Sequence, residues 1–144
     1  MRIRLTSSLL FVLALPSEPA AAQVCSVPSQ RSSIHAAVLD PDCAVVNVAF
    51  GSYVESVAVH RSVWINGAST ATTIVRGRVL VRSSGTVLEM TNLSVDARGA
   101  TNGCYDAIEV ASGAGLRPSA VATVGGASIN AACPLFADSF DYGL

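Results

Sequence analysis

Four cysteines are the residues of this 144-residue chain whose chemistry is easiest to specify: Cys25, Cys43, Cys104 and Cys133. If the chain is exported, an even number of cysteines predicts two disulfides. The separations of 18 and 29 residues favour the pairs Cys25–Cys43 and Cys104–Cys133. A zinc site is the alternative, but the chain has no Cys-x-x-Cys pair, and both histidines lie far from any cysteine. We predict one disulfide at each end, and neither a metal nor a cofactor.

Trp64, Arg78 and Arg82 are the side chains that could bind a ligand. In Val63-Trp64-Ile65 the two aliphatic residues point one way in a strand, so Trp64 points to the other side. An outward indole can stack on the apolar face of a sugar ring, or it can pack under a loop. Arg78 and Arg82 belong to a local basic cluster that could bind an acidic glycan or form a solvated strand face.

Asp96 and Arg98 share a side if their strand continues past Val95. One Asp with Glu89 nearby does not provide the several oxygen ligands that calcium needs. A solvated pair in a turn is therefore the simpler interpretation of Asp96 and Arg98. His35 and His60 have no Ser or Cys partner that the sequence identifies, so we expect structural or solvated roles for both.

The first 22 residues have the features of a secretory signal peptide. Two arginines open the chain, and the apolar run Leu9–Leu15 follows, which is too short to span a bilayer. A small-x-small pattern ends at Ala22, so we expect cleavage there and a mature chain from Gln23 without a transmembrane segment. The predicted location is secreted, periplasmic or on the cell surface.

Composition excludes some partners and favours β-structure. Charged residues make up 13% of the chain and aromatic residues 6%, while Val, Ala, Ser and Gly are abundant. Without Arg2, Arg4 and Glu18 the formal net charge changes from −1 to about −2, which argues against nucleic-acid binding. A chain this short holds one domain, which we place at residues 23–132, followed by a tail at 133–144.

The pattern of apolar residues predicts the elements that position these side chains. Ser32 or Ser33 can cap a short helix over Ile34–Leu39, and Asp40-Pro41 ends it. Apolar triplets then recur, separated by short turns such as Gly51-Ser52-Tyr53. Triplets are too short for an ordinary sandwich but fit a solenoid, in which each strand stacks on its counterpart one coil earlier. The triplets lie at 46–48, 57–59, 63–65, 73–75, 79–81, 88–90 and 93–95.

After Gly99 this pattern weakens. Residues 105–110 and 120–124 could be strands of a last coil, and residues 112–115 and 125–126 are typical of loops.

The segment Ser33–Gly99 resembles the first coils of right-handed parallel β-helix proteins of the pectin-lyase-like superfamily. The resemblance lies in SIHAAV, in GSYVE, in VAVHRSVWINGAS and in TTIV. Phe50 stands where the family usually has Pro, and Thr91-Asn92 replaces a small residue and Gly. The resemblance implies an all-β fold: a short parallel β-helix of about four coils with an N-terminal capping helix. It implies no particular activity, because many functions share these coils.

The sequence leaves open whether the chain is an enzyme. It lacks the Asn-Thr-Asp, Asp-Asp and Gly-His-Gly motifs of polygalacturonases, and it lacks the paired Asp of the esterases. We therefore expect a non-catalytic structural module, or one that binds a polysaccharide or cell-surface component. The alternatives are a polysaccharide lyase or glycoside hydrolase of the same fold, or a shortened remnant of one. The end, Leu135-Phe-Ala-Asp-Ser-Phe-Asp141, resembles an F-x-D-G-F-E tail of exported gammaproteobacterial proteins.

Overall fold

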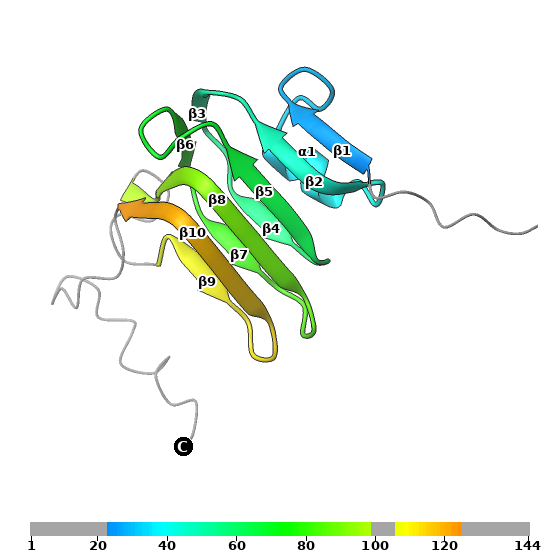
Figure 1. Ribbon diagram of the computed structural model, residues 1–144. Helices are drawn as coiled ribbons and strands as arrows, with labels where there is room; N and C mark the ends of the chain where they lie inside the picture. The colour runs from blue at the N-terminus through cyan, green and yellow to red at the C-terminus, as the bar shows by residue number, and fades with distance from the viewer. Residues whose placement is uncertain (1–22, 99–105, 125–144) are drawn as a thin grey trace, which may run out of the picture.

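The computed structural model describes residues 23–98 and 106–124, which form strands and one short helix (Figure 1). The fold is all-β, as predicted, and the strand pairings are parallel. In chain order the elements are β1 (Gln23–Val27), α1 (Ile34–Leu39), β2 (Cys43–Val48), β3 (Gly51–Tyr53), β4 (Val57–Val59), β5 (Val63–Gly67), β6 (Thr73–Arg76), β7 (Val79–Val81), β8 (Val87–Asp96), β9 (Ile108–Val110) and β10 (Gly115–Val124).

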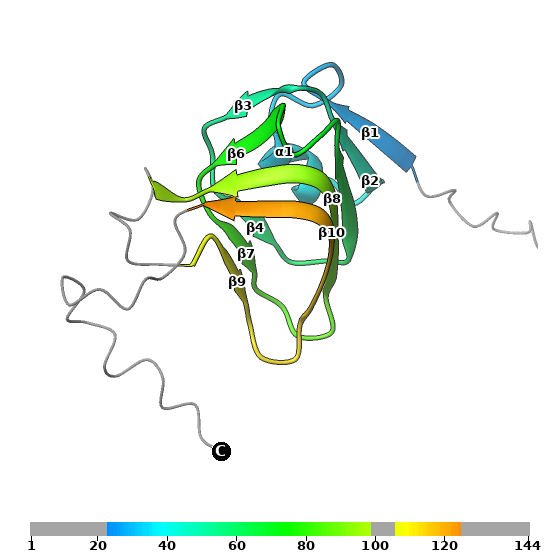
Figure 2. The ribbon, with the colours of Figure 1, turned by 60° about the vertical axis from the view of Figure 1, so that its left-hand side comes forward.

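The strands form two sheets around one core. The larger sheet has the order β1-β2-β5-β8-β6-β3, with β10 also paired to β8, and the smaller sheet has the order β4-β7-β9. The first part of β8 pairs with β5 and its last part pairs with β6. This double pairing curls the larger sheet into a half-barrel, and the smaller sheet lies across its open side (Figure 2).

Alternating side chains fill the space between the two sheets. In β4 and β7 the outer valines of each triplet are 0–1% exposed, and the middle residue is only partly buried. This alternation follows from the two-residue period of a strand. Each buried Val, Ile or Leu contributes about 1.5–3 kcal/mol to folding through the removal of apolar surface from water. The two outer residues of these triplets therefore point inward, and in the triplet 73–75 one of these inward residues is the polar Thr73, whereas Ile74 is half-buried on the other side.

Helix α1 covers one end of this core. Ile34, Ala37 and Val38 on its inner face are 0–1% exposed. The Ser33 hydroxyl accepts a hydrogen bond from the Ala36 N–H (3.0 Å), which confirms Ser33 as the N-cap. The Glu55 carboxylate accepts from the N–H groups of Ile34 (3.0 Å) and His35 (2.8 Å). Three donors at the helix start are thus satisfied, one by the cap and two by a distant loop.

Arg61 holds the other end of α1. Its guanidinium donates to the carbonyl oxygens of Asp40 and Cys43 (2.6 Å for Cys43), which follow the last turn of the helix. Asp40 is the C-cap of the helix, and its carbonyl also accepts from the Cys43 N–H (3.1 Å). Arg61 therefore joins the chain before β5 to the connection between α1 and β2.

A disulfide joins β1 to β2. Cys25 and Cys43 are bonded with a Cα–Cα distance of 5.4 Å, and both side chains are buried in the core. This confirms the first predicted pair. The predicted pair Cys104–Cys133 lies outside the described residues, as do the signal peptide and the tail, and these stay predictions.

Two strands bend at equivalent points. Asn92 in β8 and Ala120 in β10 have positive φ angles of 54° and 49°, and they lie side by side because Leu93 pairs with Val121. Asn tolerates this left-handed conformation because its short polar side chain can hydrogen-bond locally, whereas the conformation is costly for Ala. The bend also explains Gly67 in β5, because a Cβ there would lie 2.3 Å from the Asn92 carbonyl oxygen.

The structure corrects several predicted boundaries: the triplets 88–90 and 93–95 belong to one strand, β8, and the strand predicted at 120–124 begins at Gly115 as β10. Gly51-Ser52-Tyr53 was expected to be a turn but forms strand β3, since Gly51 pairs with Thr73 and Tyr53 with Val75. Pairing to a distant strand compensates here for the low strand propensity of Gly and Ser. The predicted loop at 112–115 ends one residue earlier than expected, because Gly115 already belongs to β10.

Candidate functional site

Trp64 lies on the outer face of the half-barrel sheet, as predicted. Its neighbours Val63 and Ile65 are 5% and 2% exposed, whereas Trp64 is 40% exposed. Register places Val45 of β2 on one side of Trp64 and Glu89 of β8 on the other. Arg117 of β10 follows Glu89. We name Val45, Trp64, Glu89 and Arg117 the Trp64 row.

Hydrogen bonds fix the orientation of the indole. Trp64 Nε1 donates to Thr91 Oγ1 (3.0 Å), and the Thr91 hydroxyl donates to Asn66 Oδ1 (2.7 Å). The Asn66 amide in turn donates to Asn47 Oδ1 (3.3 Å). Asn47, Asn66 and Thr91 form a polar row beside the Trp64 row, since the register pairs them on β2, β5 and β8. The indole is therefore held in place before any ligand arrives.

A shallow depression lies beside Trp64. It has a volume of about 250 Å³ and its lining includes Ser62, Trp64, Val87, Glu89 and Arg117. Glu89 Oε1 and Arg117 Nη1 form an ion pair (3.1 Å) at its rim, with 43% and 72% of their side chains exposed. An exposed pair of this kind adds little to stability. It does supply hydrogen-bond donors and acceptors next to an aromatic surface.

Arg78 and Arg82 lie elsewhere, at the two ends of β7 in the smaller sheet. Both bind one carboxylate: Arg78 Nη2 lies 2.6 Å from Glu109 Oε2, and Arg82 Nη1 lies 3.0 Å from Glu109 Oε1. Arg78 also donates to the Asp106 carbonyl (3.3 Å). The structure therefore brings the two arginines together but does not bring them to Trp64, and Glu109 offsets part of their charge.

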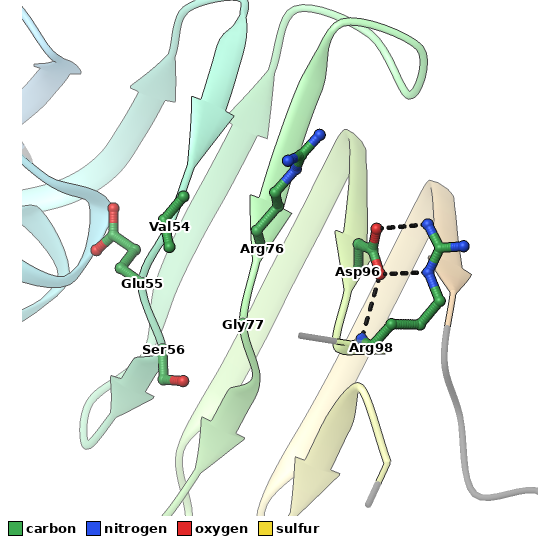
Figure 3. Close-up of a pocket in the computed structure, with 7 residues that line it drawn as sticks. All are labelled: Val54, Glu55, Ser56, Arg76, Gly77, Asp96 and Arg98. Atoms are coloured by element: carbon green, nitrogen blue, oxygen red, sulfur yellow. Dashed lines mark hydrogen bonds and ion pairs between the residues drawn. The ribbon is translucent and has the colours of Figure 1, made fainter. Parts of the chain in front are cut away.

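A larger cavity, of about 620 Å³, lies along the stacked connections after β3, β6 and β8 (Figure 3). Asp96 and Arg98 meet there, with Arg98 Nε and Nη2 donating to the two Asp96 oxygens (2.9 and 2.8 Å). Glu55 points away from Asp96 in this view, toward its bonds with α1. Gly77 lies in the middle connection of this stack. A Cβ at this position would lie 2.0 Å from the Glu55 carbonyl oxygen, which explains why the residue is glycine.

The charge state of Asp96 does not suit proton transfer. The hydrogen bond from Arg98 lowers the pKa of Asp96 to about 2, against an ordinary value of 3.8. A general acid must hold a proton near neutral pH, and a general base must have a higher proton affinity than this. The geometry supports the interpretation of Asp96 and Arg98 as a mutually satisfied pair.

The histidines and acidic groups form no metal centre in the part of the chain that the structure describes. His35 Nδ1 accepts from the Ala58 N–H (3.3 Å), which gives His35 a structural role. No group of three or more metal-ligating side chains occurs within residues 23–98 and 106–124. Over the same residues, no helix has the length and apolar character needed to cross a membrane.

The polar row is the part of the site that our sequence analysis missed. A signal for it exists, because Asn47 and Asn66 each follow an inward residue at the same place in successive strands. Aligning the apolar triplets 46–48 and 63–65 would, however, have paired Asn47 with Trp64, so the polar row depends on the observed register, which pairs Asn47 with Asn66.

Comparison with protein-family models, curated proteins and solved structures finds no match to this chain.

Proposed function

We propose that this chain is an exported, non-catalytic protein whose Trp64 row binds a carbohydrate, and that its fold is a short right-handed parallel β-helix of about four coils. Parallel pairing supports the β-helix. Val45 pairs with Trp64, Trp64 with Glu89, and Glu89 with Arg117, so strands stack in chain order on one face. The Cys25–Cys43 bond supports export, since disulfides persist in oxidising compartments.

The half-exposed, hydrogen-bonded indole of Trp64 is the observation on which the binding proposal depends. Sugar rings have an apolar face that stacks on an aromatic ring, and their hydroxyls need donors and acceptors at the edge. The Glu89–Arg117 pair and the polar row supply both kinds of group. The charges of Glu89 and Arg117 cancel, so the geometry favours a neutral polysaccharide over an acidic one.

The proposal is tested by binding of the secreted chain to insoluble neutral polysaccharides, cellulose and chitin, and to polygalacturonate as the acidic polymer. We expect retention on a neutral polymer, and a loss of about tenfold or more in affinity for Trp64→Ala, since an aromatic anchor contributes on the order of 1.5 kcal/mol or more. Phe50→Ala is the matched control, because Phe50 is an aromatic residue that is 78% exposed and belongs neither to the Trp64 row nor to the lining of the depression beside it.

Other outcomes separate the alternatives. Binding that survives Trp64→Ala but is lost in Arg78→Ala/Arg82→Ala would assign an acidic ligand to the smaller sheet. Release of reducing or unsaturated sugar ends, abolished by Asp96→Asn, would identify an enzyme of the lyase or hydrolase class. A chain that neither binds nor cleaves any of these polymers would contradict the proposal and favour a structural role or a remnant.

A further inference from the structure

The end of the fold formed by β9 and β10 leaves core positions open to solvent. Val81 of β7 is 1% exposed, but its register partner Val110 in β9 is 39% exposed. Leu88 and Leu93 of β8 are 0% exposed, whereas their partners Leu116 and Val121 in β10 are only partly buried. The side chains point into the core on both strands of each pair, so the last layer lacks a covering layer.

The opposite end is covered. There α1 buries Ile34, Ala37 and Val38 against the first strands, and Figure 1 shows α1 and β10 at opposite ends of the sheet stack. Stacked β-structures need such terminal covers, because an uncovered layer exposes apolar surface and unpaired backbone groups. One end of this protein therefore has its cover among the described residues and the other does not.

The edge of β10 is poorly suited to pairing with another strand. The Gly115 N–H donates to the Thr86 carbonyl (2.8 Å), so Gly115 directs its backbone groups toward β8. The backbone groups of successive residues in a parallel strand point to alternate sides. The backbone groups of Leu116 and Pro118 therefore point toward the open edge. Proline has no N–H to donate, so Pro118 interrupts any further ladder. A second copy pairing edge to edge would meet this interruption.

We propose that residues 125–144 of the same chain cover this end. They follow directly on Val124, the last residue of β10, and their length of twenty residues is ample to cross a surface of this size. They include several large apolar side chains, which are Ile129, Leu135, Phe136, Phe140 and Leu144. The predicted Cys104–Cys133 bond would also tie this segment close to Asp106, where the chain enters β9.

Amide hydrogen exchange and nuclear Overhauser contacts in the full secreted chain test this inference. The Val124 carbonyl accepts from the Ala97 N–H (2.9 Å), so the backbone groups of Val124 face β8. By alternation from Gly115 and from Val124, the amides that face the open edge include those of Leu116, Val121 and Thr123. We expect these edge amides to be protected in the wild type. We also expect contacts between aromatic rings of residues 125–144 and the methyl groups of Leu116 and Val121.

Phe136→Asp should speed exchange at the edge amides by about tenfold or more while Val46 in β2 keeps its wild-type rate, because only local opening is affected. Phe50→Asp is the matched control and should leave the edge amides unchanged. Edge amides that exchange freely in the wild type would overturn the inference, as would the absence of the aromatic-to-methyl contacts. Protection that rises with protein concentration would also overturn it and assign this end to a second copy.

Discussion

At the scale of single residues, an ion pair and an unusual backbone angle lead to testable predictions. The ion pair is that of Asp96 with Arg98. The Arg98 guanidinium donates to both carboxylate oxygens of Asp96, and the Arg98 backbone N–H donates to Asp96 Oδ1 (3.2 Å). These hydrogen bonds favour the ionised carboxylate in the folded protein, where the pKa is about 2. The ordinary pKa of 3.8 applies to the unfolded chain.

Asp96→Asn should therefore have a pH-dependent effect. A carboxyl group whose pKa is lowered on folding stabilises the protein above its unfolded pKa, and this contribution is lost as the pH falls toward the folded pKa. We expect the difference in Tm between wild type and Asp96→Asn to be constant from pH 7 to 5 and to shrink between pH 4 and 2. Thermal melts across this range measure it.

Arg98→Ala provides the control, because it removes the main cause of the lowered pKa of Asp96 and should remove most of the same pH dependence. A Tm difference that is equal at pH 7 and pH 2.5 would contradict this account of the pair.

Ala120 allows a second prediction at this scale. Its φ of 49° costs about 1 kcal/mol for a residue with a Cβ, and Asn occupies the equivalent position 92 in β8. Ala120→Asn should raise the free energy of unfolding by up to about 1 kcal/mol in urea titrations. Ala122→Asn in the same strand, where no positive φ occurs, should not raise it. Equal effects of the two substitutions would contradict the backbone argument.

At the scale of elements, α1 shows how a short helix is stabilised. Six residues are too few for a helix to be stable alone, so its termini depend on groups from elsewhere in the chain. Glu55 supplies the acceptors at its start, and Arg61 supplies the donors beyond its end. Burial of its apolar face and these contacts from the connections that precede β4 and β5 together hold the helix over the core.

Glu55→Ala should lower the free energy of unfolding by about 1–3 kcal/mol, because it leaves two N–H groups at the start of α1 without partners. Glu55→Gln should cost less, since its amide oxygen can still accept one hydrogen bond. Val54→Ala is the neighbouring control, because Val54 is 82% exposed. Urea unfolding of the three variants checks the order, and an equal loss for Glu55→Ala and Val54→Ala would disprove it.

The elements also show what the sequence could predict. Helix Ile34–Leu39 and the inward valines follow from local signals, the Ser33 cap and the two-residue alternation. Strand β3 has no such signal, because it exists through pairing of Gly51–Tyr53 with β6. The same limit applies to sites: outward Trp64 was predictable from its two neighbours. The shared Glu109 of Arg78 and Arg82 depends on the register between β7 and β9.

At the scale of the whole molecule, stability depends on contacts between residues far apart in the sequence. Cys25 and Cys43 are the one pair of described residues joined covalently across such a separation, 18 positions. The bond restricts the unfolded chain and ties β1, an edge strand of the larger sheet, to β2.

Cys25→Ala/Cys43→Ala should lower the free energy of unfolding by about 3 kcal/mol, the cost of releasing a loop of this length. Urea unfolding of the oxidised variant and the oxidised wild type measures the loss. Reductant should shift the wild-type midpoint in the same direction as the double substitution. An unchanged midpoint in both experiments would contradict the contribution of this bond to stability.

The Trp64 row has a consequence for how a long ligand would lie on it. Neighbouring strands are about 4.8 Å apart, so the four side chains of the row extend over roughly 14 Å across the sheet. Along this line the surface changes from aliphatic Val45 to aromatic Trp64, then to acidic Glu89 and basic Arg117. The row is thus asymmetric end to end. A polymer chain that lies across the strands, and whose own two ends differ, would bind in one direction rather than in both.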